Sequence, residues 1–230
     1  MQIKKSLIMI LAESALELVP HEIWKHPSVI KYASLKGKKV SEILLDRSYH
    51  HSAILKLKNA DKRGRPDIVH FSLLEATSSP LYLKGFMKIY VHNINDEIIE
   101  IKESVRLPKS YFRFEGLMEK LFKERKIVSP NNKTLLEIKN QSFKELISDI
   151  KPSIIIGLSR LGEKNDFEGV AKELVKYDRP AFVVGGFPRG HFSKSIALEF
   201  DKLYSCHELS LEAHLVIARI VYEFEKQLKI

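Results

Sequence analysis

Two short apolar runs that each end in glycine constrain the fold of this chain more than any other feature. The run at 154–156 precedes Gly157, and the run at 181–184 precedes Gly185. Runs rich in isoleucine and valine are typical of parallel strands that are buried on both faces. Ligands of open α/β sheets bind at the carboxyl ends of such strands, where glycine lets them approach the backbone. The pattern predicts an α/β fold with a backbone-lined small-molecule pocket between residue 152 and about residue 219.

The same strand-then-glycine pattern also occurs in ordinary turns between strands and helices, so the two readings remain alternatives at this point. The sequence contains neither Gly-x-Gly-x-x-Gly nor Gly-x-x-x-x-Gly-Lys-Ser/Thr, which excludes the two common nucleotide-binding loops. Apolar residues recur at helical spacing from Ser210 to Lys229. We expect this final helix to close the pocket.

Length and composition favour one large domain in a reducing compartment. A chain of 230 residues with 44% hydrophobic residues is ordinary for a globular protein. Its single cysteine, Cys206, excludes an internal disulfide and a cysteine-based metal cluster, and suits the cytoplasm. Glu13 limits the first apolar run to residues 7–12, which is too short for a signal peptide and predicts a buried first strand. No run approaches the ~18 apolar residues of a membrane span.

Positive charge is concentrated in two segments. Residues 56–65 carry five basic side chains and one acidic one, and residues 102–126 carry eight basic and four acidic ones, within a net charge of +9. Localised positive charge is what a polyphosphate partner such as RNA requires. The alternative is a solvated, lysine-rich surface without a partner.

Coarse patterning predicts the remaining elements. Expected are a helix at 27–36, a β-hairpin at 87–102, helices at 117–126 and 165–177, and a strand at 135–138. Ser142 and Glu145 form a capping-box pattern at the start of a further short helix. Residues 127–133 read as a turn and as the seam between an N-terminal region and the pocket region.

Three polar segments are candidates for chemistry. The segment 46–51 is either an active-site rim or a helix cap, and its adjacent pair His50 and His51 makes a poor metal site because neighbours face different ways. In the segment 62–67, Asp67 is expected to orient the guanidinium of Arg65; the alternative is a helix start with a solvated arginine. In the segment 106–116, arginines alternate with aromatic residues that either stack on unpaired bases or belong to the core.

Four of these segments together resemble a known family. Leu-Leu-Asp-Arg-Ser-Tyr-His-His (44–51), Lys-Arg-Gly-Arg-Pro-Asp-Ile-Val-His (62–70), Arg-Leu-Pro-Lys-Ser-Tyr-Phe-Arg-Phe-Glu-Gly-Leu-Met (106–118) and Gly-Gly-Phe-Pro-Arg-Gly-His-Phe (185–192) occur in the expected order. They resemble the ribosome-biogenesis methyltransferases that modify nitrogen-1 of a pseudouridine in small-subunit rRNA, members of the SPOUT class of the nucleolar essential protein or essential-for-mitotic-growth type.

The resemblance implies a trefoil-knotted α/β fold with a mostly parallel sheet, although knots are rare and no spacing here reveals one. It implies one domain over residues 1–230, with a hairpin and basic RNA-binding extension at 84–126 and a cofactor-binding knot region at 152–230. It also implies a homodimer that binds S-adenosyl-L-methionine in the knot, with no metal and no membrane.

The resemblance further implies roles for individual residues. Arg65 meets the target RNA and is braced by Asp67, and these two are the candidate catalytic residues; Arg106, Lys109 and Arg113 complete the RNA contact. The methyl donor is held by Gly185, Gly190, Leu203, Tyr204, Ser205, Cys206, His207 and Glu208. Three residues depart from the family pattern: Lys109 replaces an arginine, and Arg189 and His191 stand where histidine and aspartate are usual, which weakens any specific role of that loop's side chains but not the role of its backbone.

The implied activity is methylation of nitrogen-1 of a pseudouridine in small-subunit rRNA, in the cytoplasm, as a step in ribosome biogenesis. The first alternative is an rRNA-binding assembly factor whose methylation is weak or secondary. A weaker alternative is a methyltransferase of the same fold that acts on tRNA.

Overall fold

One eight-stranded sheet organises the molecule. The computed structural model describes residues 5–230, and the strands lie in the order β4-β5-β3-β2-β1-β7-β6-β8. Their bounds are β1 Leu7–Ser14, β2 Met87–Asn93, β3 Glu97–Ile101, β4 Lys126–Val128, β5 Thr134–Asn140, β6 Ile154–Lys164, β7 Pro180–Gly185 and β8 Lys202–Ser205. β2, β1, β7, β6 and β8 run parallel, while β3, β5 and β4 are antiparallel. The sheet confirms the predicted α/β class and both predicted parallel strands; β7 ends at Gly185 as predicted, whereas β6 continues past Gly157 to Lys164.

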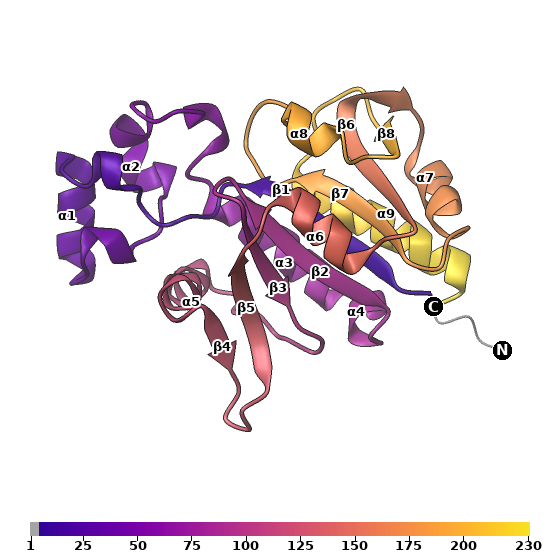
Figure 1. Cartoon of the computed structure of the whole chain (residues 1–230), viewed down its shortest axis with the longest axis horizontal. Coiled ribbons are helices and arrows are strands. Elements are labelled where there is room, and N and C mark those ends of the chain that lie inside the picture. Colours follow the sequence, from indigo (N-terminus) through magenta and orange to yellow (C-terminus); the bar gives the residue numbers. More distant parts are fainter. Residues whose placement is uncertain (1–4) are drawn as a thin grey trace.

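Helices cover both faces of the parallel half (Figure 1). Their bounds are α1 Pro27–Lys36, α2 Arg47–Ile54, α3 Pro66–Ser78, α4 Pro80–Leu83, α5 Tyr111–Glu124, α6 Phe143–Ile150, α7 Phe167–Leu174, α8 Lys194–Ala197 and α9 Ala213–Leu228, with 3-10 turns at His21–Ile23, Val40–Glu42 and Ala60–Lys62. Residues of α3, α5, α7 and α9 pack on one face of the sheet, and residues of α6 and α8 pack on the other. None of the helices within residues 5–230 has the length and apolar composition needed to cross a membrane.

β1 connects the two cores because its side chains alternate between them. Leu7, Met9 and Leu11 lie in the core under α3 and α9, whereas Ile8 and Ile10 lie in the core under α6. Every residue of β1 is buried. Such alternation within the apolar run 7–12 of β1 is expected at the centre of a sheet that is covered on both faces.

A third cluster stands apart from the sheet. The residues from 19 to 57 fold around α1 and α2 with their own apolar core, which includes Val29, Ile43 and Ile54. This part extends to one side of the sheet in Figure 1. Asp46 caps α2 by accepting a bond from the Ser48 amide at 2.8 Å, so the helix-cap reading of this segment is the one that the structure supports.

Several boundaries differ from the sequence predictions. α5 begins at Tyr111, six residues before the predicted start, so the arginine-aromatic segment is largely helical. Ile127 and Val128 belong to β4, and residues 129–133 turn from β4 into β5 within the same sheet, so this segment is a turn, as predicted, but not a seam. The predicted β-hairpin is confirmed, because β2 and β3 pair antiparallel; the sequence did not indicate that β2 also pairs with β1. α9 begins at Ala213, three residues after the predicted start, and residues 210–212 lie in the wall of the cleft described below.

Other local predictions are confirmed. Pro66 occupies the first turn of α3. Ser142 and Glu145 form the complete capping box of α6, with the Glu145 amide donating to Ser142 Oγ at 3.3 Å and the Ser142 amide donating to Glu145 Oε2 at 2.8 Å.

His50 makes the stability of the α1–α2 cluster sensitive to acid. The ring is fully buried, its Nδ1 accepts a bond from the Asp46 amide at 3.0 Å, and burial lowers its pKa from 6.5 to about 4. The unfolded chain therefore takes up a proton near pH 6.5 that the folded chain refuses until about pH 4. The resulting stability, about 3 kcal/mol, is present above pH 6.5 and is lost as the pH falls through 4.

Urea unfolding between pH 4 and pH 7 checks this account with the variant His50→Asn, whose amide oxygen can accept the same bond. The variant is expected to be less stable at pH 7 but to lose less stability on acidification than the wild type. An unchanged pH dependence in the variant would assign the acid sensitivity to other groups.

Candidate functional site

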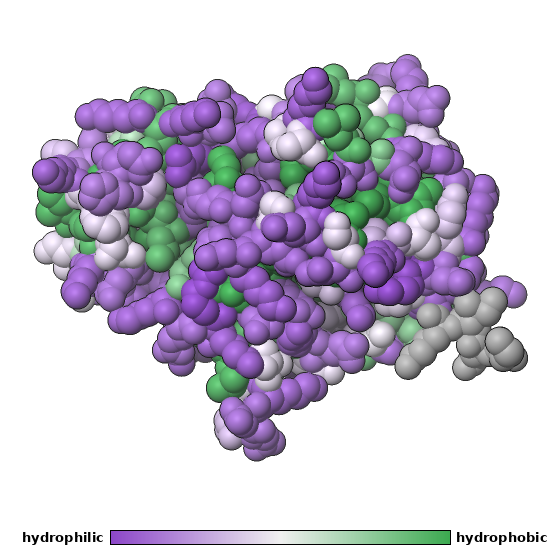
Figure 2. Space-filling model, in the orientation of Figure 1, coloured by the Kyte–Doolittle hydropathy of each residue, from purple (hydrophilic) through white to green (hydrophobic). Residues whose placement is uncertain are grey.

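A cleft of about 450 Å³ lies at the carboxyl ends of β7 and β8, beside the middle of β6. Its wall is formed by Arg65, Ile68, Leu158, Ser159, Arg160, Phe167, Val184, Gly185, Phe187, Pro188, Arg189, Gly190, His191, Phe192, Tyr204, Ser205, Cys206, His207, Leu209, Ser210, Leu211, Glu212, Ala213 and Val216. Apolar surface gathers beside it, in the region of β6 and α8, on an otherwise mostly hydrophilic face (Figure 2). The position is the one that the two glycine-ended strands predicted.

Most of the residues predicted to hold the methyl donor line this cleft. Gly185, Gly190 and the stretch 204–207 are part of its wall. Leu203 and Glu208 are not. Leu203 pairs with Gly157 in the β6–β8 ladder, and its side chain lies against that glycine. Glu208 is exposed and forms a surface ion pair with Lys164 at 3.6 Å.

Gly162 permits an unusually close approach of β6 to its neighbour β8. A Cβ atom at this position would lie 2.6 Å from the backbone of both Leu203 and Tyr204. The late part of β6 therefore passes directly against the backbone of β8, and no other residue fits there. Gly190 has a different requirement, since its φ of +96° belongs to the region that glycine occupies without strain.

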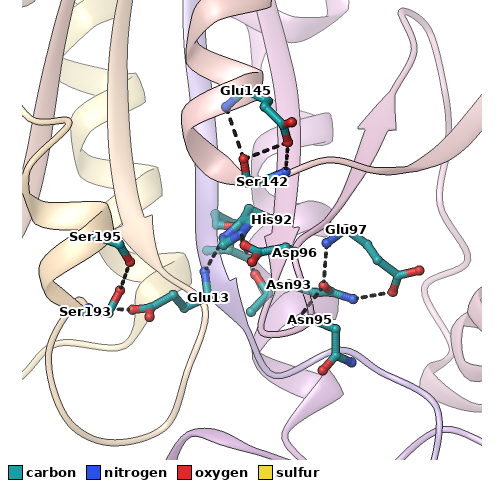
Figure 3. Close-up of polar contacts among 12 residues, drawn as sticks. Glu13, His92, Asn93, Asn95, Asp96, Glu97, Ser142, Glu145, Ser193 and Ser195 are labelled. Carbon is teal, nitrogen blue, oxygen red and sulfur yellow. Dashed lines mark hydrogen bonds and ion pairs between the residues drawn. The ribbon is translucent and has the colours of Figure 1, made fainter.

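The loop 186–193 forms one side of the cleft and is anchored to β1. The Gly186 amide donates to the Ala12 carbonyl at 2.8 Å, and the Ala15 amide donates to the Gly186 carbonyl at 2.8 Å. At the far end of the loop, the Ser193 amide donates to Glu13 Oε2 at 3.0 Å (Figure 3). The loop is thus held at both ends by the carboxyl end of β1.

Glu13 is itself fixed by a chain of contacts. Its carboxylate accepts a bond from Lys62 Nζ at 2.9 Å, and its amide donates to His92 Nδ1 at 3.2 Å. His92 Nε2 lies 2.9 Å from the Asp96 carboxylate (Figure 3). Burial lowers the His92 pKa, so a neutral ring with Nδ1 as acceptor and Nε2–H as donor satisfies both contacts.

Lys62 and Arg63 point into the protein, so they fit neither alternative for the basic run 56–65, an anionic partner or a solvated surface. Lys62 Nζ donates to the Glu13 carboxylate. The same ammonium group lies 4.4 Å from the centre of the Phe187 ring. Arg63 is buried and forms a two-bond pair with Glu17, with Nε to Oε1 at 2.7 Å and Nη2 to Oε2 at 2.5 Å. These charges hold the segment against β1 and are not available to a ligand.

Arg65 is the member of this run that reaches the cleft. Asp67 grips its guanidinium with two bonds, Nε to Oδ1 at 2.8 Å and Nη2 to Oδ2 at 2.7 Å, as the sequence predicted. The hydrogen bond to Asp67 is the main reason that the pKa of Arg65 is raised above its ordinary value. Both side chains remain about one third exposed, so the remaining Arg65 donors face the cleft and solvent.

Arg106, Lys109 and Arg113 are exposed and do not line the cleft. Their segment is nevertheless packed onto α3, since His70 Nε2 lies 2.8 Å from the Pro108 carbonyl and the His70 ring stacks on Phe114 at 4.4 Å. The aromatic residues divide as follows: Phe114 is buried, Tyr111 is half-buried with its hydroxyl on the Asp46 carboxylate, and Phe112 is 75% exposed. One aromatic ring of the segment is therefore free to meet a base.

The residues of the cleft wall are suited to bind a small molecule, and they are not suited to hold a metal ion. Within residues 5–230, no three His, Cys, Asp or Glu side chains gather as metal ligands would. Burial raises the pKa of the Cys206 thiol to about 11, so it stays protonated at neutral pH and is a poor nucleophile.

The sequence analysis missed part of the wall. Residues 158–160 follow Gly157 directly within β6, and that glycine was the available signal. Leu209 was not predicted. Residues 210–213 were assigned to the final helix that was expected to close the pocket, and their place in the wall confirms this expectation, although Glu212 was not singled out.

The fold and the cleft together define an α/β methyltransferase of the class that the four motifs indicated. The model of the EMG1/NEP1 methyltransferase family matches residues 9–225, and the chain belongs to this family. It is 42% identical over 221 residues to the ribosomal RNA small subunit methyltransferase Nep1 of Staphylothermus marinus, covering 96% of each chain. It is 43% identical over 222 residues to Nep1 of Thermococcus sibiricus, covering 96% of this chain and 99% of that protein.

A solved structure agrees with this assignment. The crystal structure of Archaeoglobus fulgidus Nep1 bound to S-adenosylhomocysteine matches with a TM-score of 0.85 and 34% identity, covering 98% of this chain and 99% of the other. S-adenosylhomocysteine is what remains of S-adenosylmethionine after methyl transfer. The predicted cofactor class is thereby confirmed.

The variant Glu13→Ala tests whether β1 holds the loop 186–193 in its binding shape. It removes the acceptor for the Ser193 amide and the partner of Lys62, so the affinity for S-adenosylhomocysteine is expected to fall about 10- to 100-fold by calorimetry. Glu13→Gln, which keeps an acceptor for the amide, is expected to lose less. Glu168→Ala, an exposed acid on α7 outside the cleft wall, serves as the control. Wild-type affinity in Glu13→Ala would show that the loop needs no such anchor.

Proposed function

We propose that this protein transfers a methyl group from S-adenosylmethionine to nitrogen-1 of a pseudouridine in small-subunit rRNA, as a step in ribosome biogenesis. The observation that carries the proposal is the position of Arg65. A guanidinium held by two bonds to Asp67 stands in the wall of the same cleft as Gly185 and the stretch 204–207. A fixed positive charge at a donor cleft is suited to stabilise negative charge on a ring that is losing a proton.

The names of the relatives support the substrate class. Nep1 of Staphylothermus marinus and Nep1 of Thermococcus sibiricus are both described as ribosomal RNA small subunit methyltransferases. The identity above 40% extends over nearly the whole length of each. In this proposal the chain uses Gly185, Gly190 and the stretch 204–207 to hold the donor.

Surface charge and aromatic character support an RNA partner. Arg106, Lys109 and Arg113 are exposed on the segment that packs against α3, the helix that begins next to Arg65. Phe112 presents an exposed ring within the same segment. Arginine forks grip phosphates and aromatic faces stack on unpaired bases, so this segment is suited to hold an RNA loop whose target base is turned out.

Alignment is the main chemical task in this reaction. The sulfonium methyl of the donor is already reactive, so the protein has to place the ring nitrogen in line with it, which supplies several kcal/mol or more. The ring must also lose its N1 proton, and Arg65 stabilises the resulting anion. The proposal includes the trefoil knot that the resemblance to this family implies.

Mass analysis of rRNA nucleosides after incubation with labelled donor tests the proposal. The expected product of the wild type is N1-methylpseudouridine, at a position in small-subunit rRNA. Arg65→Ala is expected to abolish methylation while S-adenosylhomocysteine binding by calorimetry stays near the wild-type value, because the donor is held mainly by backbone. Turnover near wild type in Arg65→Ala would contradict its role, and a different labelled nucleoside would contradict the substrate.

We also propose that the protein acts as a homodimer. Phe71 of α3, Leu83 of α4 and Tyr222 of α9 are each more than half exposed, and α9 packs against both of the other helices. Exposed apolar side chains on neighbouring helices are typical of an isologous interface. Light scattering is expected to give twice the 26.5 kDa of one chain, and Tyr222→Glu combined with Phe71→Glu is expected to give the monomer. A monomeric wild type at micromolar concentration would contradict the proposal.

A further inference from the structure

Three carboxylates surround Arg65, and they differ in what else they bind. Asp67, Glu212 and Asp46 all act electrostatically on its guanidinium, with the direct bond to Asp67 as the largest influence on its pKa. Asp67 is committed to Arg65 through both of its oxygens. Asp46 is buried, accepts a bond from the Ser48 amide at 2.8 Å and accepts the Tyr111 hydroxyl. Neither carboxylate is free to receive a proton from a bound base.

Glu212 is different because its carboxylate has no structural task. It lines the cleft, it is exposed, and within residues 5–230 it makes no side-chain hydrogen bond or ion pair. It occupies the N-cap of α9 without capping the helix, at a position where serine, threonine, aspartate or asparagine is usual. The described wall of the cleft contains no second carboxylate.

The other titratable groups of the wall are less suited to accept a proton. Cys206 is a buried thiol whose pKa burial raises to about 11. His207 Nδ1 already accepts a bond from the Leu209 amide at 3.0 Å. His191 is exposed on the loop 186–193, next to Arg189. The charged and titratable groups that share the wall with Glu212 are thus Arg65, Arg160, Arg189, His191, Tyr204, His207 and Cys206.

We propose that Glu212 is the proton acceptor of the methyl transfer. The inference rests on the proposed function, because it requires a target ring nitrogen that carries a proton. As the bond from N1 to the methyl carbon forms, the bond from that carbon to sulfur breaks, and its electron pair leaves with sulfur as a neutral thioether. The N1 proton passes to a Glu212 oxygen, and afterwards to water.

Two different residues carry out the two tasks of deprotonating the ring and stabilising its charge. Glu212 removes the N1 proton, and Arg65 stabilises the negative charge that this loss leaves on the base. Arg65 cannot accept a proton itself, because a guanidinium remains protonated at any physiological pH. A positioned general base contributes about 10²- to 10⁴-fold to a rate.

Single-turnover kinetics of Glu212→Gln test the inference, because the amide keeps the size of the side chain and removes its basicity. With saturating RNA and donor, the rate is expected to fall about 10²-fold or more. The affinity for S-adenosylhomocysteine is expected to stay unchanged, and the affinity for RNA to stay unchanged or to tighten. The remaining rate is expected to rise with pH up to the range where N1 ionises unaided.

Two further variants sharpen the result. Glu163→Gln removes an exposed carboxylate on β6 that lies outside the cleft wall, and it is expected to keep the wild-type rate and pH profile. Glu212→Ala opens space for a small carboxylate, so added formate is expected to restore part of its rate. A residue with a purely structural role would not be replaced by a dissolved anion.

Each alternative outcome is distinguishable. A Glu212→Gln rate within about threefold of wild type, or a loss confined to donor affinity, overturns the inference; the second result assigns the carboxylate to the ammonium group of the donor. The single-turnover rate of His191→Gln provides a second comparison. If that rate falls as far as in Glu212→Gln, and formate restores it there but not in Glu212→Ala, His191 is the proton acceptor. A wild type that yields no N1-methylated pseudouridine refutes the proposed function itself.

Discussion

The burial of β1 between two apolar layers is the constraint on which the other parts depend. Its odd and even residues pack into different cores, so its direction, register and depth are fixed at once. β2 and β7 pair with it in parallel, although they are far apart in the sequence. Its carboxyl end then carries Glu13, which anchors the loop 186–193 and Lys62. The position of the cleft wall therefore follows from the packing of one strand.

The basic side chains of this protein have two different roles, and the composition does not distinguish them. Lys62 and Arg63 form ion pairs inside the structure, with Glu13 and Glu17. Arg65, two residues later, is directed outward by the start of α3 and by Asp67. A buried arginine needs a carboxylate with matching geometry, and Glu17 supplies it, which allows Arg63 to be buried. Such partners lie more than forty residues away and are invisible in a local motif.

The sequence predicted the parts that depend on local pattern. The strand that ends at Gly185, the capping box of Ser142 and Glu145, and the orientation of Arg65 by Asp67 each rest on neighbouring residues, and the structure has them. What the sequence did not indicate depends on distant contacts. The hairpin of β2 and β3 was predicted correctly, but the pairing of β2 with β1, which places β2 inside the sheet, was not. The segment around Glu212 was expected to close the pocket, but no role was predicted for its side chain, because an apolar helical pattern does not single out one exposed acid. The partner contacts of Glu13 could not be predicted, because an acid after an apolar run does not reveal what it will face.

The close approach of β8 to Gly162 has a consequence for biosynthesis. The cleft is assembled from residues as far apart as Arg65 and Val216, and β8 must already lie against Gly162 before its wall is complete. A nascent chain that has emerged only as far as β7 lacks the part of the wall that β8 and α9 supply. Competence for the cofactor thus arrives only after residues as late as Val216 have left the translating ribosome.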